Sequence, residues 1–168
     1  NPPPFWRGEP GGEGSPFQAM PDTEKHALAH VFKVVVDPYI GKLGVFRVHQ
    51  GVLRRDAQLF VGDGRRPFRI AHLYRVQGKD YIEVETLVPG EIGAIAKVDE
   101  ITFDSVLHDS HEEDHIFLKP LQFPLPMQGL AVETRRKSDE QRMFEVLHRL
   151  ELEDPCFRVE RHPTTHET

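Results

Sequence analysis

Apolar residues between His26 and about Pro120 recur at the short spacing that is typical of β-strands. In one run, Phe32 and Val34 fall on one face of an expected strand, while Val31 falls on the other. Apolar residues on both faces predict a strand that is buried on both sides. The next run, residues 46–49, alternates apolar and polar side chains, which predicts a half-exposed strand.

Turn residues punctuate this region at intervals of roughly ten residues, as in compact β-folds. Asp63-Gly64 separates the apolar run 59–61 from the run 68–70, a strong short-range signal for a β-hairpin. Gly78 and Pro89-Gly90 mark further turns. Many short strands at this interval predict a closed barrel or a sandwich.

The pattern changes towards the C-terminus. Alternation at 130–132 predicts a short strand, and residues 138–141 (Ser-Asp-Glu-Gln) resemble a capping box at a helix start. Apolar positions within 143–150 share one helical face, and Asp154-Pro155 ends the helix. Another strand is expected at 157–159, so the sequence predicts a β-α-β unit whose apolar face lacks a complete cover.

Composition divides the chain into three segments. Residues 1–25 are rich in Pro, Gly and Glu and are expected to be a linker or tail. Residues 26–120 form the expected β-barrel, and residues 121–168 the α+β unit. A single cysteine, the lack of a leader and the lack of a long apolar run favour a soluble, cytoplasmic protein without a membrane partner.

Charge is distributed unevenly around the net value of −6. Residues 41–80 carry nine Lys/Arg against three Asp/Glu, a net of +6, whereas residues 81–120 carry two against ten, a net of −8. The basic run 65–79 contains aromatic residues, and such a face could follow a phosphate backbone. An ordinary solvated strand face is the alternative.

Catalytic and cofactor motifs are absent from the sequence. There is no phosphate-binding loop, and the glycine cluster 8–14 carries two glutamates and no lysine, so we expect neither a nucleotide site nor a catalytic residue. His108, His111 and His115 lie close together in an acidic segment and could bind a metal ion. A solvated acidic loop without metal is the interpretation that we favour, because no long helix carries these residues.

Three motifs resemble the elongation factor G family, in family order. The stretch 32–53, FKVVVDPYIGKLGVFRVHQGVL, is similar to the opening of the family's second domain. Residues 89–92 (Pro-Gly-Glu-Ile) resemble a later Gly-Asp-Ile turn, and residues 153–159 resemble the Glu-Asp-Pro-x-Phe segment of its third domain. The sequence departs from the family at Lys97-Val98 and at residues 104–107, which indicates a divergent paralogue.

The resemblance implies a translation-factor β-barrel followed by the start of a ferredoxin-like domain. It implies a non-catalytic module that binds the ribosome and relays the state of a separate GTPase domain, where GTP and Mg²⁺ would bind in the parent protein. The family barrel contacts the small subunit, so small-subunit rRNA and the parent's own domains are the expected partners. A module from a ribosome-recycling or ribosome-protection GTPase remains open, as does a small metal-binding protein. The candidate rRNA contacts are Arg65, Arg66, Arg69, Arg75 and Lys79, with Lys42 and Arg47 as a second choice.

Overall fold

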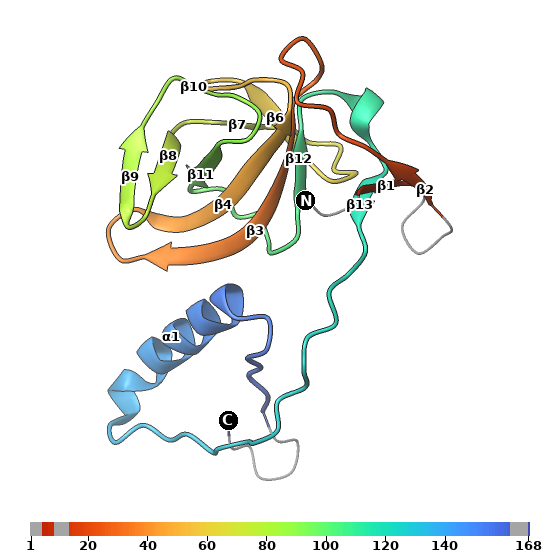
Figure 1. Cartoon of the computed structure of the whole chain (residues 1–168). Helices are drawn as coiled ribbons and strands as arrows, with labels where there is room; N and C mark the ends of the chain where they lie inside the picture. Colours follow the sequence, from red (N-terminus) through yellow and green to blue (C-terminus); the bar gives the residue numbers. More distant parts are fainter. Residues whose placement is uncertain (1–4, 9–13, 162–167) are drawn as a thin grey trace. The chain divides into compact units, whose positions relative to one another are not determined.

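The computed structural model describes residues 5–8, 14–161 and 168, in two compact units, Asn1–Pro120 and Leu121–Thr168 (Figure 1). The first unit is built from short strands. They are β1 Phe5–Arg7, β2 Ser15–Phe17, β3 Leu28–Asp37, β4 Gly41–Gln50, β5 Leu53–Arg54, β6 Gln58–Val61, β7 Phe68–Arg69, β8 Leu73–Gln77, β9 Asp80–Glu83, β10 Thr86–Leu87, β11 Ile92–Ala96, β12 Val106–His108 and β13 Ile116–Leu118.

Eight of these strands form one antiparallel sheet in the order β7-β6-β12-β3-β4-β11-β8-β9. The sheet curls into a half-barrel around an apolar core (Figure 1), to which Phe46, Leu59, Leu73 and Ile95 contribute fully or almost fully buried side chains. Burial of these side chains against one another is the main stabilising force of such a fold. The prediction of a mainly β, barrel-type domain is confirmed.

Two of the three predicted turns join strands that pair with each other, whereas Pro89-Gly90 lies between β10 and β11, which do not pair. The Asp63-Gly64 segment lies between β6 and β7, which pair antiparallel, and β8 and β9 form a hairpin across Gly78. Gly78 has φ +63°, a left-handed conformation that glycine adopts without steric cost. These turns were predictable because their chemistry is local.

The side chains of β3 do not alternate between the two faces of the sheet in the simple way that was predicted. Its register with β4 pairs Val31 with Phe46 and Lys33 with Val45, which leaves Phe32 without a partner in a β-bulge. Because the extra residue reverses the alternation, Val31 and Val34 both enter the core. Phe32, which was predicted to be buried, is 39% exposed.

Part of the predicted linker, residues 1–25, is folded; residues 1–4 and 9–13 of that prediction lie outside the described residues. β1 pairs with β13 and β2 in a second, three-stranded sheet. Phe5 is 2% exposed and packs with Leu28 and Ile116, and Arg7 forms an ion pair with Glu113. Composition suggested a tail, but these long-range contacts order the segment.

The second unit contains a 3-10 helix, η2 Lys137–Asp139, and a helix, α1 Glu140–Glu153. The helix and its end before Pro155 were predicted correctly. The strands expected at 130–132 and 157–159 were not, since the structure describes both segments without strand structure. In the described part of this unit the Val132 N–H donates to the Thr168 carbonyl oxygen at 2.8 Å, but this single bond does not amount to the ladder of bonds that a strand pair needs.

The predicted capping box at 138–141 is also wrong. Ser138 lies inside η2, and the residue that precedes α1, Asp139, makes no side-chain cap hydrogen bond. Gln141 donates instead to Glu145, one turn along the helix. The 3-10 turn moves the helix start past the serine, so the pattern was right about a helix and wrong about its cap.

Across the described residues, none of the helices is long and apolar enough to span a bilayer.

Candidate nucleic-acid interface

The seven cations proposed as RNA contacts come from several elements of the first unit. Lys42 and Arg47 lie on β4, Arg69 on β7 and Arg75 on β8; the other three, Arg65, Arg66 and Lys79, lie in the β6–β7 and β8–β9 turns. β7 is at one edge of the eight-stranded sheet, and β8 is next to the other edge. Arg69 and Arg75 are therefore on different strands, and alternation along a single strand does not place their side chains on a common face.

Three of the seven cations have partners within the unit. The Arg69 guanidinium lies 3.0 Å from Asp56, and that of Arg75 lies 2.8 Å from Glu91. Lys42 donates to the Asp99 carbonyl oxygen at 2.7 Å. The basic run 65–79 contains no acid in the sequence, but in the fold Asp56 and Glu91, from loop segments before and after it, offset two of its arginines.

Burial lowers the pKa of Lys42, and the nearby carboxylates of Asp99 and Glu100 oppose this shift. An ammonium group that is partly buried and already hydrogen-bonded has little freedom to reach a phosphate. Lys42 is accordingly a weaker candidate than its charge alone suggests.

Arg65 and Arg66 remain the best-placed pair. Both side chains are exposed in the turn between β6 and β7, and among the ion pairs of the described residues neither has an acidic partner. Adjacent exposed guanidinium groups can each contact a phosphate, in bidentate geometry where the spacing allows it. Arg47 and Lys79 are also exposed, and among the ion pairs of the described residues neither has such a partner, but neither is directly followed or preceded in the sequence by a second cation.

The histidines considered for metal binding contact other groups of the protein, and His108 and His111 both lie within 3.5 Å of Asp114. His108 is 1% exposed, with its ring nitrogens 2.8 Å and 2.7 Å from the carbonyl oxygens of Ser110 and Gly62. His111 contacts Asp114, and His115 contacts Asp63. Within the part of the chain that the structure describes, no group of three or more His, Cys, Asp or Glu is placed to hold a metal ion. The geometry therefore offers no support for the metal-binding alternative.

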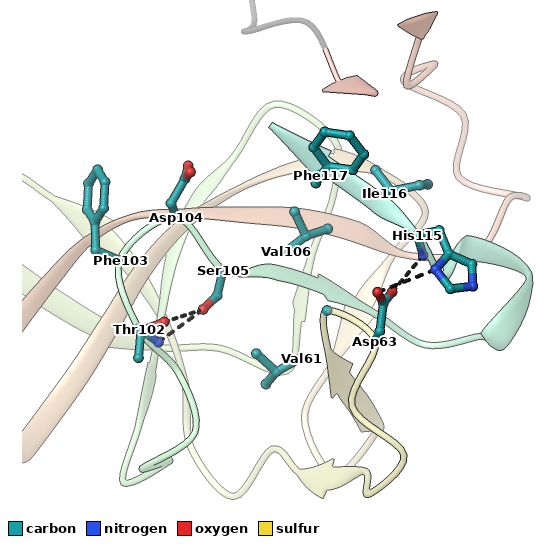
Figure 2. A pocket seen from close by; sticks show the side chains of 11 residues that line it. Val61, Asp63, Thr102, Phe103, Asp104, Ser105, Val106, His115, Ile116 and Phe117 are labelled. Atoms are coloured by element: carbon teal, nitrogen blue, oxygen red, sulfur yellow. Dashed lines mark hydrogen bonds and ion pairs between the residues drawn. The ribbon is translucent and has the colours of Figure 1, made fainter. Parts of the chain in front are cut away.

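A cavity of about 330 Å³ opens next to the turn that carries Arg65 and Arg66 (Figure 2). Three separate segments line it: 61–63, 102–106 and 115–117. In Figure 2 the aliphatic side chains of Val61 and Val106 lie between the 102–105 turn and the Asp63–His115 pair. Phe103 and Phe117 add aromatic surface to the lining.

Hydrogen bonds fix the polar groups of this cavity. The Asp63 carboxylate accepts from the His115 backbone N–H at 2.7 Å, and its second oxygen lies 3.4 Å from His115 Nδ1. Asp104 lies 2.8 Å from His30 Nε2, and its backbone N–H donates to Val31.

Two of the lining residues, Asp104 and His115, have left-handed φ values of +67° and +61°. Non-glycine residues in this region cost about 1–3 kcal/mol each and persist only where surrounding contacts hold them. The hydrogen bonds at each backbone N–H supply such contacts. The lining is therefore preorganised.

Sequence reasoning did not identify this cavity. Its lining residues are up to 56 positions apart, from Val61 to Phe117, and only the Asp63-Gly64 turn carried a local signal. The other lining residues meet through the pairing of β12 with β6 and of β13 with β1, which no local pattern specifies.

Comparison with known proteins agrees with this architecture. Residues 26–107 match the family model for elongation factor G domain 2, and residues 123–168 match that for elongation factor G, domain III. The crystal structure of a protein from Thermus thermophilus is similar over 85% of this chain, with 32% sequence identity and a TM-score of 0.70. The match covers 21% of that protein, so the chain corresponds to about a fifth of its length.

The curled β-domain and both family matches define the chain as a module of a translation factor. The chain belongs to the elongation factor G family, and the resemblance inferred from its motifs is confirmed.

Proposed function

We propose that the chain is a non-catalytic module that binds the ribosome and relays conformational change within an elongation-factor-G-like GTPase during protein synthesis in the cytoplasm. Its family membership carries this proposal, because both matched segments correspond to domains other than the GTPase domain. In the longer protein, GTP and Mg²⁺ would bind to a separate domain. The chain would contribute shape and contacts rather than chemistry.

The contact we propose is with small-subunit rRNA through the β6–β7 turn. Arg65 and Arg66 are exposed there and have no acidic partner among the described ion pairs. Cations that neutralise phosphates release condensed counterions, so binding through this turn should weaken as salt rises. Arg69 and Arg75 would contribute less, because Asp56 and Glu91 already offset their charge.

The relay role draws support from the way in which the N-terminal strand is held. Arg7 on β1 pairs with Glu113, whose other carboxylate oxygen accepts from Gln50 Nε2 on β4 at 2.9 Å. Phe5 fills the apolar space beside them. A strand fixed by buried apolar and charged contacts moves with its domain as one body, as a mechanical relay requires.

Co-sedimentation of the chain with isolated small ribosomal subunits across a salt series tests the RNA contact. The double variant Arg65→Glu/Arg66→Glu should weaken binding about tenfold or more at low salt, given about 1 kcal/mol for each charge-assisted contact. It should also flatten the salt dependence by roughly two units of slope.

The matched control is Arg135→Glu/Arg136→Glu, which changes charge equally in another exposed arginine pair. If both double variants weaken binding to the small subunit equally, binding depends on net charge alone, which would contradict a specific contact at Arg65 and Arg66. Unchanged binding in a folded Arg65→Glu/Arg66→Glu variant would refute the proposed contact. Circular dichroism establishes folding of each variant.

A further inference from the structure

The cavity beside the β6–β7 turn combines features that suit one component of RNA. Its floor is aliphatic, with Val61, Val106 and Ile116, and Phe103 and Phe117 add aromatic surface. At about 330 Å³ it lies at the lower end of the range of about 300–1,000 Å³ that small-molecule sites occupy. A site of this size and lining fits a flat ring system rather than an extended ligand.

Charge excludes phosphate from the cavity itself. The described residues that line it include the carboxylates of Asp63 and Asp104 and no lysine or arginine. The nearest exposed guanidinium groups along the chain are those of Arg65 and Arg66, two and three positions after Asp63. Consecutive Cα atoms are about 3.8 Å apart, so these arginines start within about 12 Å of the Asp63 Cα atom. The cavity lining therefore carries carboxylates, and the arginines nearest to it along the chain follow in the same turn.

We infer that the cavity binds a single unstacked nucleobase of RNA, while Arg65 and Arg66 contact the flanking phosphates. This inference rests on the proposed function and specifies its RNA contact. Proteins commonly recognise single-stranded RNA by stacking splayed bases on aromatic side chains and hydrogen-bonding their edges. Carboxylates line the cavity and the nearest arginines along the chain lie outside its lining. This arrangement suits a nucleotide that places its base in the cavity and its phosphates outside.

The carboxylates determine which bases the cavity prefers. Asp63 accepts one hydrogen bond from the His115 backbone, and an ionised carboxylate has about four acceptor positions, so its capacity is not exhausted. Asp104 likewise uses one oxygen towards His30. Free acceptor capacity selects bases with exocyclic amino donors, as carboxylates do with the N4 amino group of cytosine. Cytosine, adenine and guanine carry such an amino group and uracil does not, so all three are preferred over uracil.

Methyl NMR of the chain tests the inference directly, with CMP, AMP, UMP and ribose 5-phosphate as probes. The ring current of a bound base should shift the methyl resonances of Val61, Val106 and Ile116. CMP and AMP should do so at concentrations about tenfold lower than UMP, because one charge-assisted hydrogen bond is at stake. Ribose 5-phosphate should leave these resonances in place.

Two variants separate base recognition from phosphate attraction. Asp63→Asn keeps an oxygen that can accept from His115 but removes the carboxylate, so the preference for CMP over UMP should fall from about tenfold to the smaller preference that Asp104 alone provides. Phe117→Leu should weaken all three nucleotides together. Arg65→Glu/Arg66→Glu should weaken all three without changing their order.

Two results would overturn the inference. One is that the cavity methyl groups do not respond to any nucleotide, and the other is that they respond equally to ribose 5-phosphate. If subunit binding still depends on Arg65 and Arg66 in that case, the proposed function stands and only the base site falls. If nucleotides shift the cavity methyl resonances but the chain does not sediment with small subunits, the base site stands and the proposed function falls.

Discussion

His49 is the residue whose chemistry is most altered by the fold. It is 8% exposed on β4, and the Phe5 ring meets it edge-on at 4.8 Å between centroids. Burial lowers the pKa of His49 to about 4, with smaller contributions from the positive charges of His30 and Arg47. The fold therefore requires the neutral imidazole.

The lowered pKa of His49 makes the first unit less stable as the pH falls. The unfolded chain protonates His49 near its ordinary pKa of 6.5, whereas the folded chain resists protonation down to about 4. The contribution of neutral His49 to the free energy of unfolding is present in full above pH 6.5 and is lost as the pH falls towards 4. The depressed pKa corresponds to roughly 3 kcal/mol over that window, since one pKa unit is about 1.4 kcal/mol.

Replacing His49 by leucine should remove this component. Denaturant unfolding followed by Trp6 fluorescence at pH 7.5 and 4.5 measures it as the difference between wild type and variant. We expect the wild type to lose roughly 2–3 kcal/mol more than His49→Leu between the two pH values. Equal losses would mean that His49 is not held neutral.

At the scale of elements, the sequence predicted the hairpins whose turns are encoded locally, but not the elements that depend on contacts between distant segments. The β6–β7 and β8–β9 hairpins were predictable because Asp63-Gly64 and Gly78 encode turns within a few residues. β1 was missed although one of its partners, β2, follows it closely, because the residues that bury Phe5 include β13, more than 100 positions away. The same limit applies to the candidate RNA site, where the acids that offset Arg69 and Arg75 come from loop segments outside the basic run.

The bulge in β3 yields a test at this scale. Alternation would bury Phe32, yet the structure places it 39% exposed beside the fully buried Val31. Phe32→Tyr and Val31→Thr each introduce one hydroxyl group. The first should change the free energy of unfolding by less than about 0.5 kcal/mol, as is usual at the surface. The second should cost about 1–3 kcal/mol, because it buries an unpaired hydroxyl group.

Chemical denaturation of both variants distinguishes the two arrangements of the strand. A Phe32→Tyr variant that loses as much stability as Val31→Thr would contradict the bulged register. Similar m-values are expected for both variants, since neither changes the surface exposed on unfolding.

At the scale of the whole molecule, the two units differ in how they are stabilised. The first has apolar clusters with fully buried side chains. In the second, no residue of α1 is buried, and large apolar side chains such as Leu130 and Leu150 are 77% and 42% exposed. Its apolar groove is lined by residues of α1 and the preceding segment, among them Val132, Met143 and Leu147. One cooperative unfolding transition for the chain is therefore not expected.

Hydrogen exchange should resolve this difference. A 14-residue helix without a buried face is marginal in water, so amides of α1 should exchange far faster than those of β3 and β4. Exposed apolar surface also favours association, and protection in residues 128–161 should rise with protein concentration. Exchange at several concentrations, with the oligomeric state measured alongside, tests both points. Strong protection of α1 that does not change with concentration, in a chain shown to be monomeric, would mean that the second unit is stable by itself.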